Sequence, residues 1–187
     1  MVYWFQLLNR LFMPSTSRAR GFTLIELLIV ITIIGLVATI SVASISTARA
    51  RSRDTKRASD MKQIQKALEL SYEPGSGYPV VASPLVIGTA TTDVLCGLGS
   101  ASGFKADQTA GNCDAGKIFM GLVPFNPTPG GASYTYRSTT GAGVACTVAP
   151  CNGFCVQTTL ERGVVSSGLA AGTIMVDQTA LKNGTCP

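Results

Sequence analysis

The 187-residue sequence contains no histidine, and this absence removes the most common general base and the most common metal ligand of proteins. P-loop, paired-carboxylate and G-x-S-x-G patterns are also missing. A calcium site near Asp177 would need clustered oxygen ligands, and the acidic residues beyond residue 72 are spaced singly. We therefore expect no enzymatic activity, no cofactor and no metal site, with most of these acids on the solvated surface.

Charge is nearly absent from residues 22–48, where Glu26 is the one residue with a charged side chain. A run of this length can span a bilayer, because a spanning helix needs roughly 20 apolar residues. Three interpretations fit: a secretory signal peptide cut after the triplet 48–50 (Ala-Arg-Ala), an ordinary single-span anchor, or a helix released by cleavage after Gly21. A signal peptide has an apolar core of only about 7–15 residues, and the first two interpretations leave a carboxylate in hydrocarbon unexplained.

Cleavage after Gly21 would give Glu26 a partner. The cut would make Phe22 a free N-terminus, and Phe22 and Glu26 are four residues apart, on one face of a helix. The new amine could pair with this carboxylate or with that of a neighbouring subunit, which would offset much of the desolvation cost. Pairing between subunits would also fix the axial register of their helices, and the helix dipole favours a negative side chain near the N-terminus.

The stretch RGFTLIELLIVITIIGLVATI, residues 20–40, resembles the class III signal of type IV pilins and the related pseudopilins. The resemblance implies that a prepilin peptidase cuts between Gly21 and Phe22 and N-methylates Phe22, and that Glu26 serves assembly and register. It further implies a structural subunit of a helical homo-oligomeric filament, built by an assembly ATPase and platform proteins. The alternatives are a pseudopilin of a type II secretion system and, more remotely, a membrane-anchored binding protein.

The sequence divides into a leader (1–21), an apolar helical half (22–48), an amphipathic helical half (49–72) and a head (73–187). Residues 22–72 lack proline and would form one rod of about 75 Å at ~1.5 Å per residue, ended by Glu73-Pro74-Gly75. The alternative is a helix broken near residues 41–47. An apolar stripe on the second half is expected to hold the head; its members are Ala50, Ala58, Met61, Ile64, Leu68 and Tyr72.

Three segments of the head alternate apolar and polar residues between glycine-rich turns, which predicts strands at 132–138, 153–161 and 172–178. Three such strands make an antiparallel meander with one apolar face, which the helical stripe would cover. Residues 73–131 are rich in Gly, Pro, Ser and Thr, and we expect them to form loops between helix and sheet. The predicted fold class is α+β: a long N-terminal helix packed on a small antiparallel sheet with disulfide-linked loops.

All six cysteines lie in the head. Their even number, without histidine, favours disulfides in an oxidising compartment, whereas a four-cysteine zinc site would leave two thiols over. A Cys96–Cys113 bridge is weakly favoured, with the other four tying the sheet connection and the tail at Cys186. The candidates are Cys96, Cys113, Cys146, Cys151, Cys155 and Cys186.

The net charge of +5 belongs to the front of the chain, because residues 73–187 carry five basic and six acidic residues. The main basic concentration comprises Arg49, Arg51, Arg53, Lys56 and Arg57. We interpret it as a collar that contacts lipid phosphates or acids of adjacent subunits where the helix leaves the membrane. A DNA-binding stripe is the alternative; nucleic acid is therefore a possible partner that the pattern does not favour.

Orientation involves a conflict. Three arginines precede the apolar run and five Lys/Arg follow it within nine residues, which by the positive-inside rule would place the head in the cytoplasm. The disulfide prediction and the pilin resemblance both place it outside, and we give these precedence. We therefore expect a single-pass precursor in the inner membrane with its head outside, and a surface filament after assembly that serves adhesion, motility or DNA uptake.

The first twelve residues, MVYWFQLLNRLF, are apolar and aromatic, unlike a pilin leader, which is usually short and hydrophilic. Translation from Met13 would give the ordinary leader MPSTSRARG. Alternatively, residues 4–12 form a short interfacial helix that ends at Pro14. The sequence is compatible with both interpretations.

Overall fold

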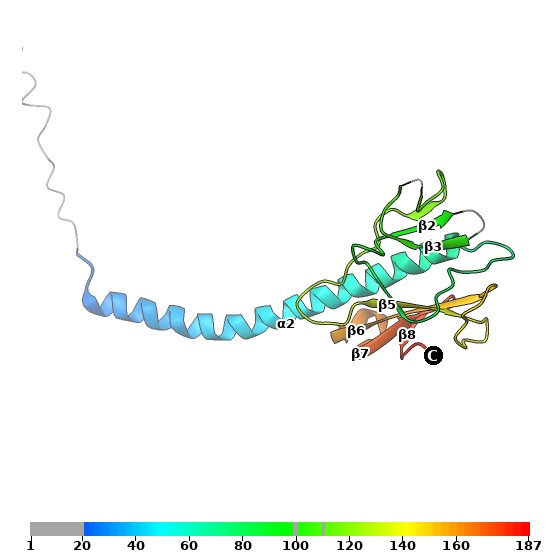
Figure 1. The fold of residues 1–187 in the computed structure, drawn as a ribbon. Coiled ribbons are helices and arrows are strands. Elements are labelled where there is room, and N and C mark those ends of the chain that lie inside the picture. The colour runs from blue at the N-terminus through cyan, green and yellow to red at the C-terminus, as the bar shows by residue number, and fades with distance from the viewer. Residues whose placement is uncertain (1–20, 99–100, 110) are drawn as a thin grey trace, which may run out of the picture. The chain divides into compact units, whose positions relative to one another are not determined.

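A computed structural model describes residues 21–187 except 99, 100 and 110. The predictions about the leader, the start at Met13 and an interfacial helix lie outside the described residues. The chain divides into two compact units, one ending at Ser44 and one comprising residues 45–187, and each is described by itself. Figure 1 gives the elements and their labels.

The first unit contains the start of helix α2, which runs from Leu24 to Leu70 without a break at residues 41–47. The large apolar side chains of this unit are exposed, from 46% at Val30 to 84% at Phe22. Hydroxyl groups along it donate to carbonyls of the preceding turn: Thr32 to Ile29 at 2.8 Å, and likewise Thr39 and Ser41. These polar groups are therefore satisfied within the helix, which suits an apolar environment.

The second unit begins with the amphipathic part of α2. Its buried face is the predicted stripe, with Met61, Ile64 and Leu68 fully buried. The helix ends at Leu70, two residues earlier than predicted, and Tyr72 lies beyond it with 42% of its surface exposed. A turn follows in which the Gly77 N–H donates to the Glu73 carbonyl at 2.8 Å, in the predicted Glu-Pro-Gly segment.

The main sheet has five antiparallel strands in the order β1-β5-β6-β7-β8. Its three central strands are the predicted meander, so the α+β prediction is confirmed. The meander packs with the helical stripe in one core, which includes Tyr134, Tyr136, Phe154 and Ile174. The strand bounds are β1 Leu85–Ile87, β5 Tyr134–Thr139, β6 Gly153–Val164, β7 Leu169–Val176 and β8 Leu181–Asn183, with the short 3-10 helix η2 at Val165–Ser167.

The prediction that residues 73–131 are loops was wrong. They contribute β1 to the main sheet and form a second sheet in the order β3-β2-β4. Its strands are β2 Val94–Leu98, β3 Ala101–Lys105 and β4 Ile118–Met120. Within this unit the two sheets lie on different sides of α2 (Figure 1). The same core includes Leu95 of β2 and Val123, which follows β4, and both residues are buried.

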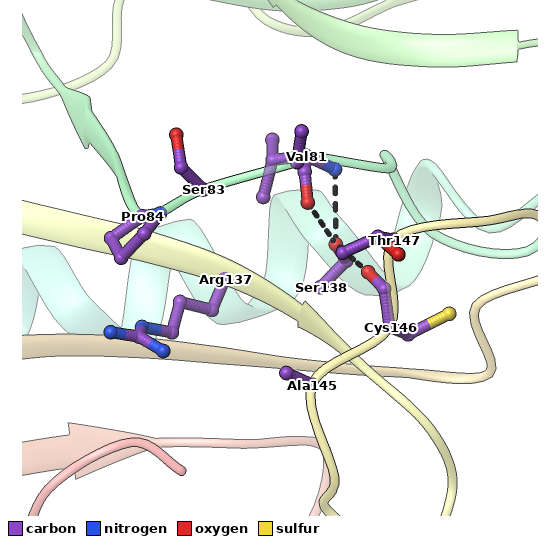
Figure 2. Close-up of a pocket in the computed structure, with 9 residues that line it drawn as sticks. Val81, Ser83, Pro84, Arg137, Ser138, Ala145, Cys146 and Thr147 are labelled. Atoms are coloured by element: carbon purple, nitrogen blue, oxygen red, sulfur yellow. Dashed lines mark hydrogen bonds between the residues drawn. The ribbon is translucent and has the colours of Figure 1, made fainter.

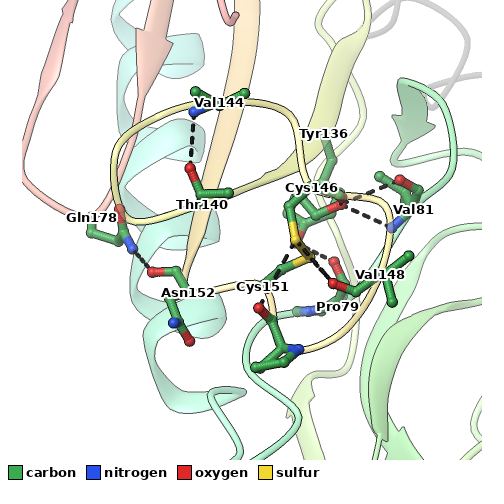
Figure 3. Close-up of a disulfide and its surroundings, with 12 residues drawn as sticks. Pro79, Val81, Tyr136, Thr140, Val144, Cys146, Val148, Cys151, Asn152 and Gln178 are labelled. Atoms are coloured by element: carbon green, nitrogen blue, oxygen red, sulfur yellow. Dashed lines mark hydrogen bonds between the residues drawn. A yellow bond between two sulfur atoms is a disulfide. The ribbon is translucent and has the colours of Figure 1, made fainter.

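Three disulfides link the head, and no described cysteine is free. Cys96 in β2 bonds to Cys113, the pair that the sequence weakly favours, and closes the second sheet onto the loop before β4. Cys155 in β6 bonds to Cys186 in the tail. Cys146 bonds to Cys151 across the turn between β5 and β6, and Figure 3 shows the surroundings of this bond.

Candidate functional site

The candidate site is the start of α2, where Glu26 sits in the first helical turn. One carboxylate oxygen, Oε2, accepts the backbone N–H of Thr23 at 2.9 Å and its hydroxyl at 2.8 Å. The Glu26 N–H in turn donates to the Thr23 hydroxyl oxygen at 3.3 Å. Thr23 and Glu26 therefore form a reciprocal capping box, which satisfies N–H groups that have no partner inside the helix.

The sequence analysis missed the role of Thr23. The signal was present, because Thr followed three residues later by Glu before an apolar run is the capping-box pattern. Phe22 precedes the cap, and its side chain is 84% exposed. Pairing between Glu26 and a Phe22 amine, cleavage after Gly21 and methylation of Phe22 stay predictions.

The rest of the first unit offers a surface for membrane or protein. Helix α2 is long and apolar enough to cross a membrane, and none of its most apolar 18-residue window is buried. Uncovered apolar surface of this extent needs a partner in water. Lipid or another protein surface would each supply one.

The basic run after this segment was predicted to face outward as a collar, and for Arg53 and Arg57 this prediction was wrong. Both bind Glu161 in β6: Arg53 donates through Nε and Nη2 at 2.8 and 2.6 Å, and Arg57 through Nη1 at 2.9 Å. The Arg57 side chain is fully buried and also donates to Asn126 and to the carbonyls of Pro127 and Gly130. These two arginines are thus structural links to the head.

Asp54 completes this link from the same turn of the helix. Its carboxylate accepts Arg57 Nη1 at 2.8 Å and three consecutive backbone N–H groups of β6, from Glu161, Arg162 and Gly163, at 2.9, 2.6 and 2.9 Å. The three amides come from an irregularity in the pairing of β6 with β7, between Leu160 and Gly163. The side chain of Asp54 is therefore an internal cap for a strand bulge.

Hydrogen bonds from Arg53 and then Arg57 lower the pKa of Glu161 to about 2. Glu161 is therefore an exception to the expectation that most head acids lie on the solvated surface. Two further acids, Glu73 and Asp177, form ion pairs with Lys117 at 3.3 Å and Lys182 at 2.6 Å.

The described part of the head contains cavities, and one of about 470 Å³ lies beside β7 and the C-terminal tail. A small one, of about 50 Å³, lies between residues 81–84 and 145–147 (Figure 2). At its wall the Ser138 hydroxyl accepts the Val81 N–H at 3.0 Å and donates to the Cys146 carbonyl at 2.6 Å. This volume holds one or two waters. Among the described residues, no group of three His, Cys, Asp or Glu side chains is placed to hold a metal.

Comparison with known proteins agrees with the site at the start of α2. Residues 16–42 match the family model of the prokaryotic N-terminal methylation motif. The chain is 32% identical over 97 residues to the type IV major pilin protein PilA of Myxococcus xanthus, covering 52% of this chain and 41% of that protein. It is 33% identical over 67 residues to the type II secretion system core protein G of Escherichia coli, covering 36% and 46%.

These matches confirm the resemblance to type IV pilins and pseudopilins. The chain spans less than half the length of each of these two relatives. No solved structure matches it.

Proposed function

We propose that this chain, which carries the N-terminal methylation motif of type IV pilins and pseudopilins, is a structural subunit of a type IV pilus-like surface filament. A prepilin peptidase removes residues 1–21, and the helix from residue 22 then enters the filament core. The observation that carries this proposal is an exposed, uncharged helical surface with one carboxylate in its first turn. The subunit does no chemistry, and an assembly ATPase and platform proteins drive its movement.

Assembly in this proposal replaces one partner of Glu26 by another. In the single chain its carboxylate is held by Thr23, which keeps it oriented at the start of the helix. Cleavage frees the amine of Phe22, which is then methylated, and this cation attracts the carboxylate more strongly than a neutral hydroxyl does. The amine of one subunit then pairs with Glu26 of a neighbour in hydrocarbon, where a misplaced charge is costly, so the pair fixes the axial register.

The precursor is proposed to lie in the inner membrane with its head outside. The candidate span supports the membrane anchor. Three disulfides, one of them joining β2 to the loop before β4 across 17 residues, support an oxidising location for the head.

Glu26→Gln tests the proposal because it keeps the size of the side chain and removes its charge. Cleavage should persist and filament yield should drop sharply. Glu69→Gln is the matched control. Glu69 is an exposed acid on the same helix, so this substitution should leave filament yield unchanged. Mass spectrometry of the mature chain should find N-methylphenylalanine derived from Phe22 at the N-terminus. Normal filament yield from Glu26→Gln, or a mature chain that starts at Arg51, would refute the proposal.

A pseudopilin of a type II secretion system is the second candidate, supported by the similarity to the Escherichia coli core protein G. Deleting the gene separates the two. Loss of surface filaments with unchanged secretion supports a pilus, whereas export that stops in cells with unchanged surface filaments supports a pseudopilus.

A further inference from the structure

An apolar side chain of the head lies exposed beside the basic turn that follows the apolar run. Phe125 is 63% exposed, and Leu122, three residues before it, is 68% exposed. Lys56 of α2 places its Nζ 5.6 Å from the centre of the Phe125 ring, within cation–π range. We name Arg49, Arg51, Lys56, Leu122 and Phe125 the interfacial rim.

The position of Phe125 is fixed by its neighbours in the chain. The next residue, Asn126, accepts Arg57 Nε at 2.7 Å, and the carbonyl of Pro127 accepts Arg57 Nη2 at 2.8 Å. Because Arg57 is buried and bound to Asp54 and Glu161, the loop is held against this turn of α2. The aromatic ring is therefore exposed by a fixed backbone.

The three cations of the rim differ from Arg53 and Arg57 in their exposure and in their salt bridges. Arg49, Arg51 and Lys56 are exposed, and none of them forms a salt bridge among the described residues, whereas Arg53 and Arg57 are paired with acids of the same chain. Arg49 directly follows the uncharged run that ends at residue 48. The seven-residue interval from Arg49 to Lys56 is about 10 Å of helix at ~1.5 Å per residue, and long basic side chains extend this reach.

We propose that the interfacial rim binds the anionic headgroup region of the bilayer that holds residues 22–48. The proposal rests on the membrane-spanning part of the proposed function and does not need the filament. Each Lys or Arg next to a span strengthens binding to anionic lipid about fivefold, and Phe and Leu beside basic residues insert at the boundary between headgroups and hydrocarbon. Docking holds the head against the membrane before the subunit is extracted.

A second copy of the chain is the less suitable occupant. Two rims would repel each other because both are positive. Three of the six acids of the head that could meet a rim, Glu73, Glu161 and Asp177, are already in ion pairs within the chain. Lipid phosphates supply the missing negative charge at the level where the chain leaves the apolar run.

Fluorescence of a single tryptophan tests the proposal on the full-length chain. The sequence has one tryptophan, Trp4, so Trp4→Phe with Phe125→Trp leaves one reporter in the rim. The protein is reconstituted in phosphatidylcholine vesicles with or without phosphatidylglycerol, each doped with brominated lipid as quencher. Trp4→Phe with Val148→Trp is the control reporter, because Val148 is 77% exposed. It lies in the turn between Cys146 and Cys151, where the Cys151 carbonyl accepts the N–H of Tyr78 beyond the end of α2, away from the rim.

We expect lipid to quench the Phe125→Trp reporter in phosphatidylglycerol vesicles and to leave the Val148→Trp reporter unquenched. Changing Arg49, Arg51 and Lys56 together to Gln should lower the ratio of docked to undocked heads roughly 100-fold, because each of the three cations contributes a factor of about five to this ratio. The matched variant Lys62→Gln/Lys66→Gln, which neutralises exposed lysines farther along α2, should leave quenching unchanged.

Quenching that survives the triple variant, or that is equal without phosphatidylglycerol, would overturn the proposal. A different result is protection of the reporter from the brominated-lipid quencher as protein density rises, whatever the lipid charge. That result would overturn the proposal and assign the rim to contact with a second copy of the chain. Carbonate extraction separates two failures: a chain that does not insert refutes the span and the rim together, whereas an inserted chain with an unquenched reporter refutes the rim alone.

Discussion

The carboxylate of Asp54 gives the most direct test of how the amphipathic part of α2 is held to the head. Asp54→Ala removes the acceptor of three β6 amides and a charge partner of Arg57, which has no solvent-exposed surface. Arg57 keeps Glu161 and its carbonyl partners, so its charge is only partly compensated. The substitution therefore leaves three backbone donors and part of a buried charge without partners.

The magnitude follows from these lost contacts. Removing one partner of a buried ion pair costs about 3–5 kcal/mol, and each unsatisfied buried donor costs about 1–3 kcal/mol. The terms overlap, because the bulge can relax and admit water, so we expect about 4–6 kcal/mol for Asp54→Ala. Asp54→Asn keeps an acceptor oxygen and loses the charge, and should cost about 2 kcal/mol.

The assay is thermal unfolding of the full chain in mild detergent, followed by near-ultraviolet circular dichroism with the disulfides intact. At about 2–4 °C per kcal/mol, Asp54→Ala should lower Tm by roughly 10–20 °C. Lys62→Ala is the control, because Lys62 is exposed and should change stability by less than about 0.5 kcal/mol. A Tm for Asp54→Ala within a few degrees of the wild type would refute the role given to this carboxylate.

Two further predictions concern the same head. Because the pKa of Glu161 is lowered to about 2, its ion pairs stabilise the fold fully above the unfolded-state pKa near 4.5, and this contribution should disappear as the pH falls from about 4.5 to 2. In thermal unfolding, Glu161→Gln should lack this part of the dependence of Tm on pH. A variant with the same dependence as the wild type would contradict this prediction. Removing the disulfides singly by Cys→Ser pairs should cost most for Cys155–Cys186, less for Cys96–Cys113 and least for Cys146–Cys151, because their separations are 31, 17 and 5 residues. Loop-closure entropy gives about 4, 3 and 2 kcal/mol, and a reversed order in the melting temperatures would show that native contacts decide instead.

The elements that could be predicted are those with a repeating local pattern. The uncharged run and the Met61, Ile64 and Leu68 spacing defined one helix, and alternation defined the three long strands of the meander. The second sheet escaped because β2 and β3 have five residues each and β4 has three, which is too short for a periodic signal. Its cohesion comes from pairing and from the Cys96–Cys113 bond, and neither is a local property of the sequence.

The start of α2 was only partly predicted for a different reason. A single charged residue within an apolar run is unusual, and the charge of Glu26 therefore predicts an ionic partner. Thr23 has no charge, yet it holds the carboxylate through two hydrogen bonds. Local capping chemistry was therefore overlooked in favour of a contact between subunits, although the two can operate in succession.

Within the basic run, the position of a residue around the helix decides whether its side chain is buried against the head or exposed. The buried stripe was predicted to pass from Ala50 to Ala58, which leaves two helical turns without an apolar member. Asp54 and Arg57 occupy that gap, and both are fully buried. A charged residue in phase with a buried stripe must find a partner across the core, and here β6 provides it. Lys56 is one position out of phase, and it remains exposed beside the Phe125 ring.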